Sequence, residues 1–414
     1  MEQYNHLLLA CLRQKCDPAL ISGQMKLMND SDWAFFSQSI TQQGITSLIY
    51  HRLKKNSLTD LLPPELCSSL HHCYLLNTAI VVRLTNAYFQ IQKAFANARI
   101  EVIALKGVHL ANSVYQQPGE RQMCDLDILV PRKDLYRASR ILIEIGFTTE
   151  KELTESELTD DMEKHLPLFR SPDRSLFIEL HWNIVNKENN LVVDMEILWE
   201  KSTTLLVNDL TMNVLSPADL LLHLCIHSIF SHQLEITIKT LCDISLLIEK
   251  YSDQWSYDDI IITAKKWGMG NSLFLILKLV NNLLSTPIPD NIASTISTKK
   301  MELMTQLAID TIFDTKNTIY SDKTETAQLP YSRPLLKKYK KIISYLFPSL
   351  QKTLRIHSLP INTNPVIAYG IHHGKFIKTK ANKIKTFLLF YSPRNKTKIK
   401  KYKRQKILMN WISE

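Results

Sequence analysis

The feature that most constrains the fold of this chain of 414 residues is a change in hydrophobic spacing near residue 100. Before this point apolar residues recur every three or four positions, which indicates amphipathic helices. From residue 101 to residue 182 the pattern changes to short runs of β-branched and aliphatic residues, which indicates strands. From Ser216 onward the helical spacing returns. The sequence therefore predicts one small sheet inside a largely helical chain.

Three strands are predicted at 101–105, 125–130 and 176–182, with short edge strands near 147–150 and 212–215. Helices are predicted at 1–14, 32–43, 64–98, 108–115, 131–145, 217–231, 236–250, 257–267 and 271–285. Pro63-Pro64 and Ser216-Pro217 mark two helix starts, and Gly146 marks a helix end. We accordingly divide the chain into a helical region (1–98), a sheet-bearing domain (99–215), a helical domain (216–330) and a basic region (331–414).

Composition excludes several classes of protein. The chain has only nine glycines and contains neither a Walker A loop nor a G-x-G-x-x-G motif, which argues against P-loop kinases and Rossmann dehydrogenases. Its seven cysteines form no C-x-x-C pair, which is typical of a reduced, cytosolic chain. The first residues lack the basic segment of a signal peptide, and no apolar run reaches the length of a membrane span. We therefore expect a cytoplasmic protein with no membrane span.

Charge is distributed unevenly along the chain. Residues 331–414 contain 20 Lys or Arg and one acid, a net charge of +19, whereas residues 1–330 carry a net charge of −9. Lys and Arg interleaved with Tyr and Phe suit the backbone and bases of RNA. The same pattern suits an anionic membrane surface or the acidic body of the protein itself. The sequence thus predicts an anionic partner for this region and leaves these three alternatives open.

Acidic residues stand at the start of the second predicted strand and inside the third. Asp125 and Asp127 are two residues apart, so on a strand both carboxylates point to the same side. Glu179 lies on the next predicted strand and completes an acidic cluster if the two strands are neighbours. Carboxylate oxygens are the ligands that Mg²⁺ prefers. The D-x-D spacing alone is weak evidence, because Asp30-Ser31-Asp32 has it too, where Asp32 is interpreted as a helix N-cap.

The context of the acids is more specific than their spacing. Three segments resemble the uncharacterised nucleotidyltransferase group of the DNA polymerase β-like superfamily: LKGVHLANSVYQQPGERQMCDLDILV, FIELHW and LSPADLLLHLCIHSIF. The resemblance spans roughly residues 30–350 and is clearest over 100–250. It implies an α+β fold with a minimal nucleotidyltransferase mixed β-sheet and flanking helices, residues 99–215 being the catalytic domain. It also implies Mg²⁺ dependence and transfer of a nucleoside monophosphate from an NTP, with release of pyrophosphate.

The resemblance also implies roles for individual residues. Asp125, Asp127 and Glu179 would be the catalytic residues and metal ligands, with Glu179 a ligand or a general base. Lys106, Gly107 and Arg121 would bind the triphosphate. Superfamily members commonly have a glycine-serine pair at the phosphate-binding turn, whereas this chain has Lys106-Gly107-Val108. Phosphate contacts would then rest on backbone N–H groups at the helix start and on the Lys106 ammonium. The alternatives are an exposed lysine at 106, an ordinary turn glycine at 107, and an ion pair of Arg121 with Glu120 or another acid.

Other polar residues near these motifs are given structural roles. His181 shares the strand face of Glu179 and is expected to be a hydrogen-bonded structural residue more than a substrate contact. His223 and His227 are four residues apart on one predicted helix, without the glutamate of a metalloprotease motif, and Asp243 is a candidate partner for one of them. Cys124 and Trp182 are expected in the core.

Two further functional classes remain beside the enzyme. One is a catalytically idle nucleotidyltransferase scaffold that acts as a binding module. The other is a toxin or effector that modifies RNA or protein. The acceptor can be a small molecule, a peptide or protein, or RNA, and the sequence names neither it nor the base of the NTP.

Overall fold

A computed structural model describes residues 2–158, 163–231, 236–295, 298–314, 353, 363–365, 369 and 396–412. By its internal contacts the chain divides into two compact units. One comprises Met1–Phe313 together with Met409–Glu414, and the other comprises Asp314–Leu408. The predicted helical region, sheet-bearing domain and most of the helical domain all belong to the first unit. The domain boundaries at 98, 215 and 330 stay predictions.

Five α-helices precede the sheet: α1 (Gln3–Leu12), α2 (Pro18–Lys26), α3 (Asp30–Gln42), α4 (Thr46–Lys55) and α5 (Pro64–Asn97), with a 3₁₀ turn at Thr59–Leu61. The helices predicted at 1–14, 32–43 and 64–98 are confirmed as α1, α3 and α5, and α2 and α4 are two further helices within the region 1–98 that the sequence predicts to be helical. The prediction of Asp32 as an N-cap is wrong. Asn29 caps α3 and accepts the Asp32 N–H, while the Asp32 carboxylate accepts the Asn29 N–H.

The sheet has seven strands in the order β3-β4-β5-β2-β1-β7-β6. Their bounds are Ile103–Ala104 (β1), Asp125–Leu129 (β2), Thr148–Thr149 (β3), Phe169–Arg170 (β4), Phe177–His181 (β5), Thr203–Val207 (β6) and Leu210–Val214 (β7). β2 and β5 at its centre are parallel, and so are β1 and β7, whereas the remaining neighbours are antiparallel. This mixed sheet among helices confirms the α+β prediction. β4 and β6 are additions that the sequence pattern does not reveal.

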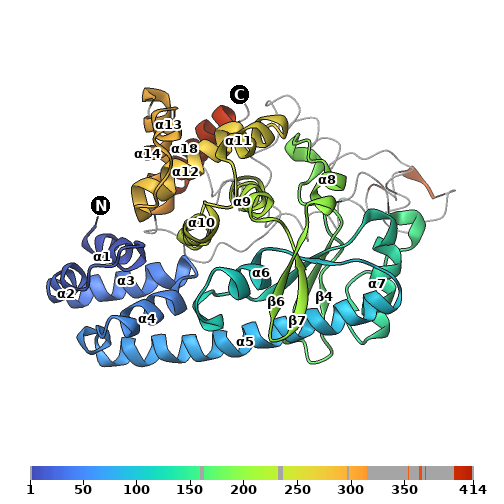
Figure 1. Ribbon diagram of the computed structural model, residues 1–414, viewed down its shortest axis with the longest axis horizontal. Helices are drawn as coiled ribbons and strands as arrows, with labels where there is room; N and C mark the ends of the chain where they lie inside the picture. Colours follow the sequence, from blue (N-terminus) through green and yellow to red (C-terminus); the bar gives the residue numbers. More distant parts are fainter. Residues whose placement is uncertain are drawn as a thin grey trace. The chain divides into compact units, whose positions relative to one another are not determined.

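One face of the sheet carries the main core. Leu126 and Ile128 of β2, with Val130 just after it, pack with apolar residues of α5 and of α7 (Leu135–Glu144) in a single buried cluster. Figure 1 shows α5 running along this side of the sheet, with α9 (Pro217–Ile226) and α10 (Ile238–Tyr251) on the other side. Because side chains alternate along a strand, Asp125 and Asp127 point away from the α5 core. They face the side on which α9 and α10 lie.

Shorter elements connect the strands. They are α6 (Lys106–Ser113), α8 (Met195–Glu200) and 3₁₀ turns at Pro118–Glu120, Arg132–Asp134, Glu155–Glu157 and Lys187–Asn189. The predicted helix at 131–145 is a 3₁₀ turn followed by α7, and Gly146 ends it with a φ of +100°, as predicted. Ser216 caps α9 by accepting the Asp219 N–H, and Pro217 is its first residue, also as predicted.

Helices make up the rest of the described chain. α9 is followed by a π-helical turn, His227–Ser231, so the predicted helix at 217–231 is α-helical only to Ile226. Beyond α10 lie α11 (Tyr257–Lys266), α12 (Gly270–Leu284), α13 (Asp290–Thr295), α14 (Lys299–Ile312) and α18 (Lys396–Ile412). Among the described helices, none combines the length and the apolar character needed to cross a membrane. Most of the basic region 331–414, including all of 375–395, lies outside the described residues.

Candidate metal and nucleotide site

The acidic residues of the two central strands lie beside each other. β2 and β5 are parallel, and their register pairs Asp127 directly with Glu179. An oxygen of Asp127, an oxygen of Glu179 and a ring nitrogen of His181 all lie within 4.8 Å of one another. Burial of the Asp127 side chain, which is 4% exposed, contrasts with 27% exposure of Glu179. The cluster therefore has a closed side and an open side.

His181 takes a more central place than the sequence indicates. Its Nε2 lies 3.0 Å from Asp127 Oδ1 and 3.2 Å from Glu179 Oε2. Its Nδ1 is buried and has no hydrogen-bond partner among the described residues. His165 packs edge-on against the ring, with centroids 5.1 Å apart. The strand face of His181 follows from the sequence, but its bridge between two carboxylates depends on the strand register.

Lys106 reaches the same carboxylate from the turn between β1 and α6. The N–H of Leu105 donates to the backbone oxygen of Asp127 at 3.0 Å, which ties this turn to β2. The Lys106 Nζ lies 2.9 Å from Asp127 Oδ1 with its side chain only 11% exposed. Lys106 has a φ of +33°, a strained value for a residue with a side chain. The alternative of an exposed lysine is therefore wrong.

These contacts shift the proton affinities of the acids in opposite directions. Burial raises the pKa of Asp127, but the Lys106 ammonium and the His181 hydrogen bond outweigh burial and hold this pKa well below its usual range. Burial and the neighbouring charge of Asp127 raise the pKa of Asp125. Burial and the charge of Asp127 raise the pKa of Glu179, but the hydrogen bond and charge of His181 together with the charge of Lys106 outweigh them, so this pKa is lowered. Asp127 thus remains ionised and negative charge accumulates around it.

A second buried lysine, Lys164, lies near this cluster. Burial and then the charge of Lys106 lower its pKa to about 8, while Asp127 and Glu179 act in the opposite direction. Lys164 belongs to the irregular segment before β4, and nothing in the local sequence pattern distinguishes it from a surface lysine. The N–H groups of Trp182 and Asn183 donate to its backbone oxygen, and the next residue, His165, forms a β-bridge with His181, which places Lys164 beside β5.

Gly107 is buried where α6 approaches the segment before β2. A Cβ built on it would lie 2.9 Å from Met123 Cε and 3.5 Å from Arg121 Nη1. Close packing of the helix start on residues 121–123 therefore requires a glycine or a shift of Met123. Binding of phosphate by Gly107 stays a prediction.

Arg121 forms an ion pair with Asp243 and not with Glu120, its neighbour in the sequence. Its Nε and Nη2 donate to the two oxygens of Asp243 on α10, both at 2.9 Å, and both side chains are buried. The Tyr115 hydroxyl donates to Asp243 Oδ1 at 2.6 Å. The interpretation of Asp243 as a histidine partner is therefore wrong, because its carboxylate is engaged by Arg121 and Tyr115. Binding of phosphate by Arg121 stays a prediction. The contact that Arg121 makes in the structure, an ion pair with the acid Asp243, is the alternative that the sequence left open.

The two histidines of the helical region lie in different elements. His223 is in α9 and His227 begins the π-helical turn. His223 is fully buried, and neither ring nitrogen has a hydrogen-bond partner in the described part of the chain. Burial, followed by the charges of Lys106 and Lys164, holds the pKa of His223 well below its usual range. A neutral histidine from α9 therefore lies close to the acidic cluster.

Two expectations about the core need correction. Cys124 is exposed and not buried, because it stands just before β2 begins, where the alternating burial of the strand has not started. Trp182 is only partly buried at the edge of the main core. The Arg132 guanidinium lies over its ring at 4.7 Å, and its Nε1 donates to the Glu163 backbone oxygen.

Comparison with known proteins identifies the family of this chain. Residues 29–285 match a family described as uncharacterised nucleotidyltransferase. The chain belongs to this family. No curated protein matches it. Among solved structures it is similar to an antigenic nucleotidyltransferase-like protein from Paracoccidioides brasiliensis, with 14% identity, coverage of 46% of this chain and 91% of that one, and a TM-score of 0.27.

The donor set of this nucleotidyltransferase family member fits a divalent metal ion. Asp127 and Glu179 present oxygen ligands, and His181 presents a nitrogen within the same small volume. In the structure the Lys106 ammonium and His181 share one oxygen of Asp127, so positive charge is already drawn to the place where a cation would bind. Hard carboxylate ligands suit Mg²⁺, which usually retains waters and binds substrate phosphates.

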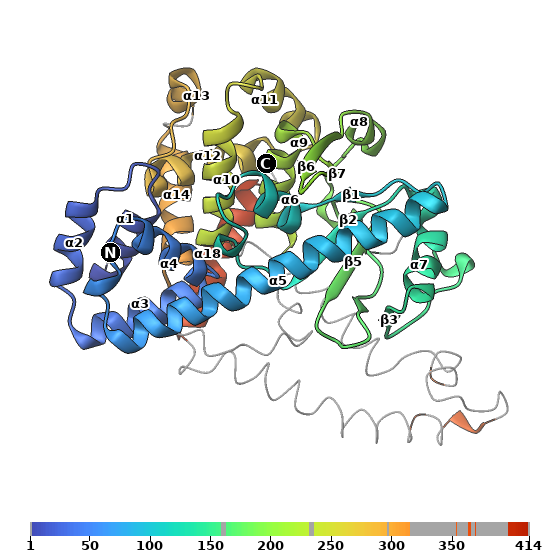
Figure 2. The same ribbon diagram turned by 60° about the horizontal axis from the view of Figure 1, so that its bottom comes forward.

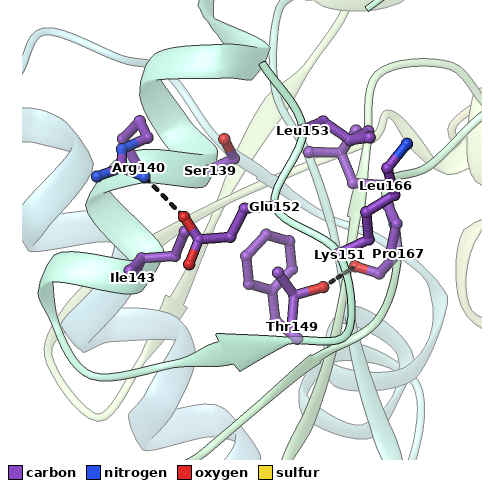
Figure 3. Close-up of a pocket in the computed structure, with 10 residues that line it drawn as sticks. Ser139, Arg140, Ile143, Thr149, Lys151, Glu152, Leu153, Leu166 and Pro167 are labelled. Atoms are coloured by element: carbon purple, nitrogen blue, oxygen red, sulfur yellow. Dashed lines mark hydrogen bonds and ion pairs between the residues drawn. The ribbon is translucent and has the colours of Figure 1, made fainter. Parts of the chain in front are cut away.

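Another hollow in the molecule is distinct from this site. Figure 3 shows a cavity between α7 and the β3–β4 region, with the Arg140–Glu152 ion pair across it. Its volume of about 10 Å³ is roughly that needed for one water molecule. Ile143, Leu153 and Leu166 contribute to its walls. A nucleotide does not fit there, so the acidic cluster remains the candidate functional site of the family member.

Proposed function

We propose that this protein is a Mg²⁺-dependent nucleotidyltransferase that moves a nucleoside monophosphate from an NTP to a hydroxyl or phosphate acceptor. In this reaction an acceptor oxygen forms a bond to the α-phosphorus. The bond from that phosphorus to the oxygen bridging to the β-phosphate breaks, and pyrophosphate leaves. When the acceptor is a hydroxyl, its proton passes to Glu179 or to solvent. Atoms and charge balance without any further reactant.

The observation that carries the proposal is the pairing of Asp127 with Glu179 across two parallel strands, with Lys106 on the same carboxylate. Asp125 adds a third acid whose pKa is raised by burial and by Asp127. Acids gathered at this density repel one another unless a cation is bound among them. A triphosphate accompanied by Mg²⁺ supplies that cation, and family membership supports an NTP as the donor.

Each residue then has a distinct task. Asp125, Asp127 and Glu179 would hold the Mg²⁺, which supplies charge neutralisation and alignment of the phosphates. The Lys106 ammonium would donate to a triphosphate oxygen, and the N–H groups at the start of α6 would face the phosphates beside Gly107. Arg121 would act through its pair with Asp243, which positions the segment leading into β2.

A second candidate function has a specific observation in its favour. The Lys106–Asp127 pair is buried and already neutralises one metal-binding carboxylate. A catalytically idle scaffold that binds partners would be compatible with such a pair, because a permanent ammonium can replace a metal ion. The two candidates differ in whether Mg²⁺ and NTP displace Lys106 from Asp127.

The test of the proposed activity is release of pyrophosphate by the full chain from each of the four NTPs, with Mg²⁺, across hydroxyl and phosphate acceptors. Replacing Asp125 and Asp127 with Asn keeps side-chain shape and removes both charges. We expect the rate to fall roughly 1,000-fold, equivalent to about 4 kcal/mol of transition-state stabilisation.

The chain offers a matched control in its other D-x-D pair. Asp30 and Asp32 lie in the first turn of α3, and the same double change to Asn there should leave the rate unchanged. If the wild type binds Mg·NTP and the Asp125→Asn/Asp127→Asn variant does not, but the wild type turns over no acceptor, the idle scaffold is favoured. Equal binding of Mg·NTP by the wild type and the Asp125→Asn/Asp127→Asn variant would reject both the metal site and the proposed function.

A further inference from the structure

A second cavity lies among α4, the segment 114–120 that follows α6, and α10. These elements lie beside one another in both ribbon views (Figures 1 and 2). The cavity has a volume of about 120 Å³. None of the acidic residues of β2 and β5 lines it. It is therefore separate from the candidate metal site, and it can admit a small molecule.

Three cationic side chains from two helices line this cavity: Arg52 and Lys55 of α4 and Lys250 of α10. The Lys55 Nζ donates to Gln116 Oε1 at 2.9 Å, and the Lys250 Nζ donates to the Ser113 backbone oxygen. The Arg52 guanidinium is half-buried and has no hydrogen-bond or ion-pair partner among the described residues. A planar guanidinium with unused donors matches two oxygens of a phosphate or carboxylate.

The cavity also presents a buried carboxylate. Glu120 is 4% exposed, and its Oε1 accepts the Gln117 N–H at 2.8 Å and lies 3.5 Å from His51 Nδ1. Burial raises the pKa of Glu120, and burial together with the charge of Arg52 lowers the pKa of His51. Neutral His51 can donate a hydrogen bond without adding charge, and Glu120 can accept one from a ligand hydroxyl. With Glu249 also on the lining, the five charged groups leave one net positive charge.

This combination favours a doubly charged oxyanion with a neutral donor group attached. Three cations can surround a phosphate, whose charge of nearly −2 at neutral pH exceeds that of a carboxylate. Glu120, which carries the opposite charge and can accept a hydrogen bond from a hydroxyl, lines the same cavity. We propose that the cavity binds the phosphate group of a small phosphate monoester that carries a hydroxyl. This proposal is independent of nucleotidyl transfer.

Chain connectivity links the cavity to the candidate metal site. Glu120 directly precedes Arg121, whose pair with Asp243 holds the segment leading into Asp125. The Lys250 contact is to Ser113, the last residue of the helix that begins with Lys106. A ligand on Arg52, Lys55 and Lys250 is thus placed to alter the orientation of the metal-site residues without touching the NTP.

The test is calorimetric titration of the full chain with two probes, inorganic phosphate and glycerol 3-phosphate, in the absence of Mg²⁺ and nucleotide. The variant Arg52→Gln/Lys250→Gln should bind both probes at least tenfold more weakly than the wild type, since it loses two of the three charge-assisted contacts. Lys54→Gln is the matched control, because Lys54 is an exposed α4 lysine that does not line the cavity. It should bind as the wild type does.

A second control identifies the site of binding. Lys106→Met removes the cation of the candidate metal site and should leave the affinity for both probes unchanged. Loss of binding in Lys106→Met with normal binding in Arg52→Gln/Lys250→Gln would overturn the proposal, as would absence of binding to the wild type at millimolar concentrations. Since Lys250 is exposed, Lys250→Gln alone tests the same idea without risk to folding, with a smaller loss of affinity expected.

Discussion

Two buried ion pairs lie on the same side of the sheet and differ in how completely they are balanced. Arg121 and Asp243 meet through two parallel hydrogen bonds at 2.9 Å, and Tyr115 adds a third bond to the carboxylate. Lys106 meets Asp127 through a single contact at 2.9 Å. His181 binds the same oxygen of Asp127, and the described residues place no side-chain partner on the other oxygen.

The surroundings of the two pairs differ as well. Arg121 and Asp243 balance each other, and the fork geometry uses both oxygens of the acid. Around Asp127, by contrast, Asp125 and Glu179 add two further negative charges, and Glu179 keeps an exposed side. The difference teaches that burial of an ion pair does not by itself indicate function. Excess charge and an unused oxygen distinguish a pair that can exchange its partner for a ligand from one that holds helices and strands together.

The largest expected effect comes from breaking the balanced pair. Asp243→Ala leaves the Arg121 charge buried without a partner, so the free energy of unfolding should fall by about 3–5 kcal/mol. Urea denaturation measures this change. The double variant Arg121→Met/Asp243→Leu, which removes both charges and keeps apolar volume, should recover most of the loss. A loss below about 1 kcal/mol in Asp243→Ala would show that the pair is not buried in solution.

A smaller effect is expected at the unbalanced pair, and it should depend on metal. Lys106→Met leaves Asp127 with His181 as its partner and should lower the free energy of unfolding by about 2 kcal/mol when Mg²⁺ is absent. Adding Mg²⁺ at ten times its Kd should restore about 1.4 kcal/mol. At the same Mg²⁺ concentration the matched variant Arg121→Met, in which Lys106 still occupies Asp127, should gain less than Lys106→Met and no more than the wild type gains. Equal responses of the two variants to Mg²⁺ would remove the distinction between the pairs.

A buried histidine that has no charged partner among the described residues extends the comparison to pH. Burial lowers the pKa of His109 on α6 to about 3, well below its unfolded value of 6.5. The unfolded chain therefore takes up a proton first, so stability is complete above pH 6.5 and is lost as the pH falls toward 3. At about pH 5.5 the loss for one such histidine is about 1.4 kcal/mol. Between these pH values the free energy of unfolding, measured by thermal denaturation, should decline less steeply in His109→Gln than in the wild type.

The smallest expected effect is steric and concerns the helix start beside Lys106. Gly107→Ala places a Cβ 2.9 Å from Met123 Cε, and the flexible methionine can move aside, so a loss of about 1 kcal/mol is expected. Gly23 in α2 is the matched control, because its Cβ would meet no atom within 4 Å. Gly23→Ala should stabilise the helix by up to about 1 kcal/mol. If Gly107→Ala lowers the binding free energy of the NTP by more than it lowers the free energy of unfolding, a role of Gly107 in phosphate binding is supported.

Local patterns predicted the elements that surround the site. The alternation in 125–130 and 176–182 indicated β2 and β5, and Ser216-Pro217 marked the start of α9. These patterns predict the structure correctly because side-chain alternation and helix capping involve only residues that are near one another in the sequence. The two-residue strand β4, which lies between β3 and β5, and the edge strand β6 lack such signals, because both are stabilised by pairing with neighbouring strands.

Composition, the strand–Lys-Gly–helix unit and the acid-bearing strands determined the family, the α+β fold and the residues Asp125, Asp127 and Glu179 as candidates. Only the tertiary structure decided which acids meet which cations. Lys106 and Asp127 are 21 positions apart, and Arg121 and Asp243 are 122 apart, with no pattern in the chain connecting either pair. Pairing at such separations depends on strand register and helix packing, which bring distant charges into a buried place where each must find a partner.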